Sequence, residues 1–106
     1  MSDTSKTTRV GKAVKATPMP NLNERFSSAQ LAAAITAKRT GMKLSLMDVS
    51  LALTISKPTL VKIEKGDTNV KLKTLLTVME YLGLSFHILS DDNSLRAEKE
   101  LNDDWY

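Results

Sequence analysis

The stretch ISKPTLVKIEKG, residues 55–66, contains the start and stop signals of a short helix. Ser56 suits the N-cap, because its hydroxyl can accept a hydrogen bond from an amide that has no partner inside a helix. Pro58 falls in the first turn, where its missing N–H costs nothing. Gly66 suits a left-handed stop at the C-terminal end. The sequence therefore predicts a helix from about Lys57 to Lys65.

Few residues of this predicted helix can be buried. Leu60 and Ile63 lie at helical spacing, and we expect them to face the core. The side chains left for other directions are those of Lys57, Thr59, Val61, Lys62 and Lys65. A well-specified helix that buries so little poses the question of what its exposed side contacts.

The composition limits what the 106-residue chain can be. It has room for one small domain with tails. The chain has no cysteine, which excludes a disulfide framework and a cysteine metal site. No apolar run approaches the roughly 20 residues of a membrane span, and the N-terminal segment MSDTSKTTRV lacks the apolar core of a signal peptide. We therefore expect a cytoplasmic protein.

The sequence contains no catalytic constellation. His87 is the only histidine and falls in a predicted strand, and the carboxylates of the C-terminal tail lack the spacing of metal ligands. No Ser/His/Asp arrangement or phosphate-binding glycine loop is present. We therefore expect no enzyme activity, no catalytic residue, no metal site and no cofactor.

Charge and periodicity divide the chain into three segments. Residues 1–20 carry four basic residues and one acid (+3), residues 21–90 carry nine and five (+4), and residues 91–106 carry two and six (−4). We expect a disordered basic arm over residues 1–21, a domain over residues 22–89 and an acidic flexible tail over residues 90–106, which ends in Trp105 and Tyr106. A basic arm and body suggest a polyanionic partner, although two solvated tails that aid solubility explain the same charges.

Three serines mark predicted helix starts. Ser27 and Gln30 have the spacing of a capping box, and Phe26 is placed to pack on Leu31. Ser45 and Ser56 repeat the serine cap, each preceded by an apolar residue that can pack on another five positions later, before helices predicted at about Leu46–Leu53 and Lys57–Lys65. Met42 continues the apolar period of the first helix, and we expect it in the core.

The fourth predicted helix, LKTLLTVMEYL, is followed by a change of period. Its apolar stripe comprises Leu72, Leu75, Leu76, Met79 and Leu82. Gly83 stops it. The segment LSFHIL, residues 84–89, then alternates apolar and polar residues, which indicates a strand.

Two short helices joined by a three-residue turn form a helix-turn-helix pattern, in which the second helix enters the DNA major groove by its N-terminal end. Ser56 and the first amides of the helix suit a phosphate, and Lys57 and Lys62 suit guanine O6 and N7. Thr59 suits a base or a phosphate, and Val61 suits a thymine methyl. An ordinary polar helix in a small bundle remains the alternative.

Residues 28–84 resemble the Xre/Cro-type helix-turn-helix family, most specifically in ISKPTLVKIEKG. The resemblance implies an all-α, lambda-repressor-like bundle of four or five helices that binds operator DNA as a dimer. It places Lys57 and Lys62 at base-reading positions with Ser56, Thr59 and Val61 beside them. It places Ser45, Lys65 and Asn69 near phosphate-contacting positions. It also implies a structural ion pair between Arg39 and Glu64.

Three residues depart from the family pattern. Leu46 stands where the family usually has a phosphate-gripping glutamine, so we expect that contact to be absent. Thr54 replaces the usual turn glycine, and because a β-branched residue is strained at positive φ we expect a differently shaped turn. Lys71 stands where a capping Ser or Thr is common.

The C-terminal part resembles HipB-type antitoxins. This resemblance implies that the strand pairs across a dimer, that the protein represses its own operon and that it neutralises a HipA-like Ser/Thr kinase toxin. The expected dimer residues are Leu84, Ser85, Phe86, His87, Ile88 and Leu89. A stand-alone phage or plasmid repressor and a protein-interaction module that has lost DNA binding remain the alternatives.

Overall fold

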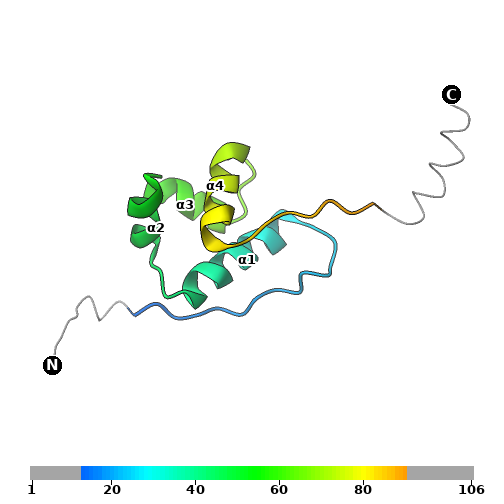
Figure 1. Ribbon diagram of the computed structural model, residues 1–106, viewed down its shortest axis with the longest axis horizontal. Helices are drawn as coiled ribbons and strands as arrows, with labels where there is room; N and C mark the ends of the chain where they lie inside the picture. The colour runs from blue at the N-terminus through cyan, green and yellow to red at the C-terminus, as the bar shows by residue number, and fades with distance from the viewer. Residues whose placement is uncertain (1–12, 91–106) are drawn as a thin grey trace, which may run out of the picture.

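The computed structural model describes residues 13–90, which contain four helices and no strand. Their bounds are α1 Ser28–Gly41, α2 Leu46–Leu53, α3 Lys57–Glu64 and α4 Leu72–Leu82. α3 contacts both α1 and α2, and α4 contacts α1 (Figure 1). The all-α helix-turn-helix class is therefore confirmed, with α3 ending one residue earlier than expected and Lys65 as its C-cap.

Serine begins three of the helices as predicted. The hydroxyls of Ser27, Ser45 and Ser56 each accept a hydrogen bond from the amide three residues later. Ser45 has a complete capping box, because its own N–H donates to Asp48 Oδ2 over 2.7 Å. The box predicted at Ser27 is only half formed. Gln30 is long enough to reach the preceding loop, where its Nε2 donates to two backbone carbonyls.

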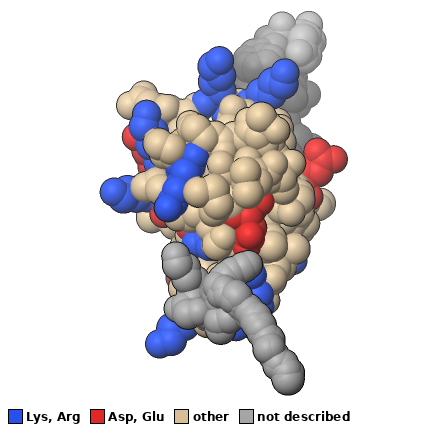
Figure 2. Space-filling view, turned by 90° about the vertical axis from the view of Figure 1, so that its left-hand side faces the viewer, with Lys and Arg blue, Asp and Glu red and all other residues tan. Residues whose placement is uncertain are grey.

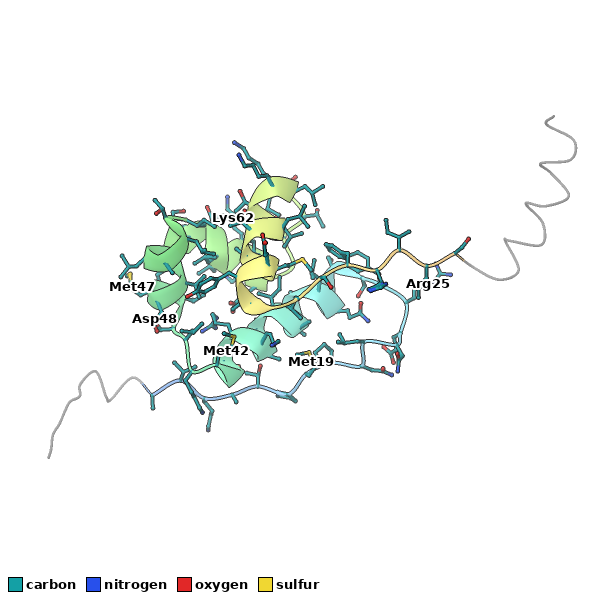
Figure 3. The ribbon with its side chains drawn as sticks, viewed as in Figure 1. Met19, Arg25, Met42, Met47, Asp48 and Lys62 are labelled. Carbon is teal, nitrogen blue, oxygen red and sulfur yellow. The ribbon has the colours of Figure 1, made fainter. Side chains whose placement is uncertain are left out.

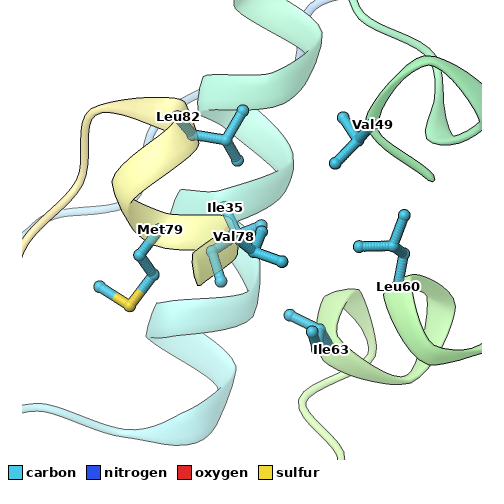
Figure 4. Packing of buried hydrophobic residues seen from close by; sticks show 7 residues of the cluster. All are labelled: Ile35, Val49, Leu60, Ile63, Val78, Met79 and Leu82. Atoms are coloured by element: carbon cyan, nitrogen blue, oxygen red, sulfur yellow. The ribbon is translucent and has the colours of Figure 1, made fainter. Parts of the chain in front are cut away.

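The core lies where α1, α3 and α4 meet α2 (Figure 4). Its buried apolar residues are Ile35, Val49, Leu60, Ile63, Val78, Met79 and Leu82. The inward orientation of Leu60 and Ile63 is confirmed.

Three residues expected in the core or on its apolar stripe are exposed. Met42 is 46% exposed, Leu72 64% and Leu76 44%, whereas Val78 is buried. The buried face of α4 follows positions 75, 78, 79 and 82, so Leu72 and Leu76 lie on its flank. The prediction for Met42 was wrong for another reason, because Met42 follows the end of α1 and belongs to the turn.

The turn between α2 and α3 keeps the left-handed conformation despite Thr54. Thr54 has φ 57° and ψ 44°, which corrects the expectation of a differently shaped turn. Its N–H donates to the Ser50 carbonyl, and the Ser50 hydroxyl donates to the Ile55 carbonyl over 2.6 Å. These bonds hold a threonine where glycine is the easier residue.

The remaining helix ends agree with the sequence. Gly66 and Gly83 both have φ 80°, the left-handed value that suits glycine. The side chain of Lys71 makes no capping hydrogen bond to α4. This agrees with the sequence, in which Lys71 replaces the usual capping Ser or Thr. The ring of Phe26, expected on Leu31, is 57% exposed and meets the ring of Phe86 edge-on with centroids 5.8 Å apart.

Two extended segments flank the helices. Residues 13–24 run beside α1 and make hydrogen bonds to it, so this part of the expected arm is attached to the domain (Figure 1). Residues 84–90 leave α4 without regular structure in the single chain. A strand needs a backbone partner, so pairing across a dimer stays a prediction. Residues 1–12 and the acidic tail from 91 onward lie outside the described residues.

Candidate nucleic-acid interface

α2 and α3 form two short helices joined by residues 54–56. Val49 of α2 and Leu60 and Ile63 of α3 are buried in the same cluster, which fixes the angle between the two helices. The opposite sides of both helices face outward, and Figure 3 shows Met47 at the outer edge of α2.

Among the described residues, no helix is long and apolar enough to span a membrane.

The start of α3 is organised by its cap. The Ser56 hydroxyl accepts from the Thr59 amide over 3.3 Å and lies 2.8 Å from the Thr59 hydroxyl. Ser56 and Lys57 are exposed, and Thr59 is half-buried. The N–H of Lys57 lies ahead of the helical hydrogen-bond ladder, where the helix dipole favours an anion. This end of the helix is therefore open to a phosphate.

Three lysines project from α3 and its C-cap. Lys57, Lys62 and Lys65 are exposed, and within the described part of the chain none of their ammonium groups has a hydrogen-bond or ion-pair partner. Val61 is half-buried, so it offers less surface than the sequence suggested. Asn69 is exposed, and its backbone N–H is held by Asp67 Oδ1 over 2.8 Å. No contact among the described residues therefore keeps these lysines from a polyanion.

The start of α2 is less open than its predicted phosphate role requires. The hydroxyl and amide of Ser45 are both engaged with Asp48. The Asp48 carboxylate adds negative charge at this exposed helix start. Leu46 packs against the core cluster. It therefore differs from the glutamine expected at this position both in lacking a polar group for a phosphate and in directing its side chain to the core.

A charged network behind α3 sets its position. Arg39 of α1 binds Glu64 of α3 with Nε to Oε2 at 2.6 Å and Nη2 to Oε1 at 2.9 Å, and both side chains are about nine-tenths buried, at 11% and 12% exposed. The ion pair implied by the resemblance is therefore present. Sequence reasoning missed two partners: the Thr36 hydroxyl donates to Glu64, and Arg39 Nη1 donates to the Leu44 carbonyl. Neither partner has a sequence signature.

Basic side chains line part of the side of the molecule that carries α2. Figure 2 shows lysine and arginine along the upper and left edges of this side, and aspartate or glutamate at the right edge and below the centre. Exposed apolar residues of α2, Met47 at 48% and Leu51 at 73%, were not predicted as part of any site. Among the described residues, no group of three or more His, Asp or Glu side chains is placed to bind a metal.

The fold and this face define a helix-turn-helix DNA-binding domain. A model of the helix-turn-helix family, HTH_3, matches residues 35–89, which are 55 of the 106 residues. The chain therefore belongs to this family of DNA-binding regulators.

Two solved structures share the fold. One is described as a complex of HipB with an O4 20mer; it has a TM-score of 0.58 and 22% identity, and the match covers 65% of this chain and 97% of that one. The other is a complex of a HipB variant with an O2 20mer, with a TM-score of 0.59, 21% identity and coverage of 66% and 97%. No curated protein matches the chain.

Proposed function

We propose that this regulator is a dimeric, sequence-specific DNA-binding antitoxin that represses its own operon and neutralises a HipA-like Ser/Thr kinase toxin. The observation that carries the DNA-binding part is the exposed face of α3, where Lys57 stands at the capped start and Lys62 in the last turn, and neither ammonium group is paired with another described residue. The antitoxin part is supported by the likeness of the fold to HipB and by the resemblance of the C-terminal segment.

Residues in and around α3 have proposed roles. Lys57 and Lys62 donate to guanine edges in the major groove, and the half-buried Thr59 and Val61 make closer contacts with bases beside them. Ser56 binds a phosphate together with the N–H of Lys57, because Pro58 has no N–H and the N–H of Thr59 is held by the cap. Further phosphates meet Lys65 and Asn69, so these residues contribute affinity rather than base preference. Ser45 would join them only if a phosphate displaced Asp48 from its hydroxyl or amide.

The proposed dimer forms through the segment after α4. Ile88 is 97% exposed, Leu89 84% and Phe86 42%, which is a large apolar surface for one short segment. Residues 84–87, 89 and 90 line one side of a groove of about 620 Å³, and residues 22–26 line another. A second copy of the chain would bury these side chains and pair the backbone of Leu84–Leu89 with its own symmetry mate.

The proposed toxin meets surfaces that DNA and the dimer leave free. The acidic tail and Trp105 are candidates, because tryptophan is enriched at the centres of protein interfaces. Both lie outside the described residues, so their involvement rests on the sequence alone.

Co-expression with a kinase-like gene adjacent to its own tests the antitoxin proposal. We expect a stable complex on gel filtration that still binds the DNA upstream of the operon, because the α3 face remains free. Recovery of two separate proteins at micromolar concentration would reject the antitoxin role and leave a stand-alone repressor.

The core packing of Leu46 favours one other candidate, a protein-interaction module that has lost DNA binding. Titration of duplex DNA with the protein distinguishes it. Binding that weakens as salt rises excludes a module that has lost DNA binding. If no binding is detected even at low salt, that module is supported.

A further inference from the structure

Pro58 is the residue at the start of α3 to which the proposed DNA contacts assign no partner. It stands second in the helix, where its missing N–H costs nothing. The other exposed residues of α3 are Lys57 and Lys62, so Pro58 is the only exposed side chain of this helix that carries no charge. Starting the helix uses the backbone of Pro58 and leaves its ring available for a contact.

The ring lies on the side of α3 that faces away from the core. The buried side of the helix is set by Leu60 and Ile63, and by Glu64 of the buried ion pair. At about 100° of rotation per residue, Pro58 and Lys62 each lie about 160° from Leu60. Residues four apart share a face of a helix, so Pro58 stands one turn before Lys62 on the outward side. Each Cα–Cβ bond of a helix also tilts toward its N-terminus, the end of α3 proposed to enter the major groove.

The chemistry of the ring limits what it can contact in a major groove. The ring consists of methylene groups and has neither a hydrogen-bond donor nor an acceptor. The apolar group that base pairs present in the major groove is the C5-methyl of thymine. A polar base edge placed against the ring would lose its hydrogen bonds to water and gain none in return. The ring therefore favours thymine by contact and disfavours the polar edges of other bases.

We propose that Pro58 is a specificity-determining residue that packs on the methyl group of a thymine in the major groove, beside the guanine contacted by Lys62. This inference rests on the proposed DNA binding by α3. Val61, for which the sequence suggested a thymine methyl, is half-buried and offers less surface than the exposed ring of Pro58. One turn of helix advances about 5.4 Å and base pairs repeat about every 3.4 Å, so the thymine lies within about two base pairs of that guanine.

Removal of single methyl groups from the DNA tests this contact. The probe is a duplex selected by the unaltered protein from a random-sequence pool. Each of its thymines is replaced in turn by deoxyuridine, which pairs like thymine but lacks the methyl group. We expect one position in each half-site at which this replacement weakens binding roughly fourfold, as expected for one buried methyl-sized group. In the variant Pro58→Ser, the same replacement should have no effect, whereas replacements at other thymines keep theirs.

Two controls separate base contact from other effects. Pro18→Ser replaces an exposed proline in the segment before α1, and its methyl effects should match those of the unaltered protein. The slope of log affinity against log salt should be the same in Pro58→Ser as in the unaltered protein, because the ring contacts no phosphate. Thermal melting checks that each variant is folded. If Pro58→Ser does not fold, Pro58→Ala takes its place, since alanine favours the helix and keeps only part of the apolar contact, which should reduce the fourfold effect.

The outcomes distinguish this inference from the proposed function. The inference is overturned if the unaltered protein shows no methyl effect, or if Pro58→Ser or its substitute Pro58→Ala keeps every methyl effect in full. It is also overturned if the variant loses affinity equally on all duplexes with its methyl effects unchanged, because Pro58 would then act only on the fold of α3. Each of these results leaves the proposed DNA binding intact. Failure of the unaltered protein to select any duplex rejects the proposed function and the inference with it.

Discussion

Removing Arg39 tests whether the buried network holds α3 in place. In the variant Arg39→Met, the Glu64 carboxylate loses both guanidinium hydrogen bonds and keeps, within residues 13–90, only the Thr36 hydroxyl. Loss of one partner from a buried ion pair costs about 3–5 kcal/mol, because the other charge stays buried without compensation. The Leu44 carbonyl also loses its donor. A domain of this size is stable by only about 5–10 kcal/mol, so we expect Arg39→Met to be largely or wholly unfolded at moderate denaturant concentration.

Urea denaturation followed by far-UV circular dichroism measures this loss. Lys73→Met is the matched control, since Lys73 is exposed on α4 and its substitution should change the unfolding free energy by less than about 0.5 kcal/mol. Combining Arg39→Met with Glu64→Leu removes both charges, and we expect the double variant to recover about 1–3 kcal/mol relative to the sum of the single changes. A cost below about 1 kcal/mol for Arg39→Met would refute the reasoning, because the pair would then lack the buried character that its geometry indicates.

Two further changes test the dimer and the turn. Phe86→Asp places a charge on the apolar segment after α4, so we expect light scattering to show monomers and operator binding to be lost; a dimer of unchanged mass would exclude this segment as the interface. Thr54→Gly relieves the left-handed strain at φ 57°, so we expect urea unfolding to show a gain of about 0.5–1 kcal/mol with DNA binding unchanged; a loss of stability would mean that the threonine side chain contributes more than its backbone costs.

The starts and ends of the helices were predicted well because each depends on residues that are close together in the sequence. Serine caps, the left-handed glycines and the bounds of α2 and α4 depend on hydrogen bonds between near neighbours, and all appear in the structure. The orientation of α4 about its own axis was predicted less well. Leu72 and Leu76 match the helical period as well as Val78 does, and only packing against α1 selects which face is buried.

The residues of the candidate site could be predicted from the sequence, but the contacts that hold its helices in place could not. The exposed lysines of α3 follow from a helix with only two inward residues, Leu60 and Ile63. The contacts of Thr36 and Leu44 with the ion pair, and that of Thr17 with Thr40, are made through single polar atoms, and those of Thr36 and Thr17 join residues more than 20 positions apart. Such contacts leave no period or motif, so only the folded structure reveals them.

Operator titration with lysine variants of α3 tests the central claim most directly. The duplex is the DNA upstream of the protein's own gene, and the control is Lys38→Ala, a lysine that lies beside Gly83 at the end of α4. We expect Lys57→Ala and Lys62→Ala each to weaken binding by about 1–3 kcal/mol, roughly 5- to 150-fold, with relaxed preference at the neighbouring base pairs. Affinity and base preference unchanged in both variants would contradict the account, because the exposed face of α3 would then not read DNA.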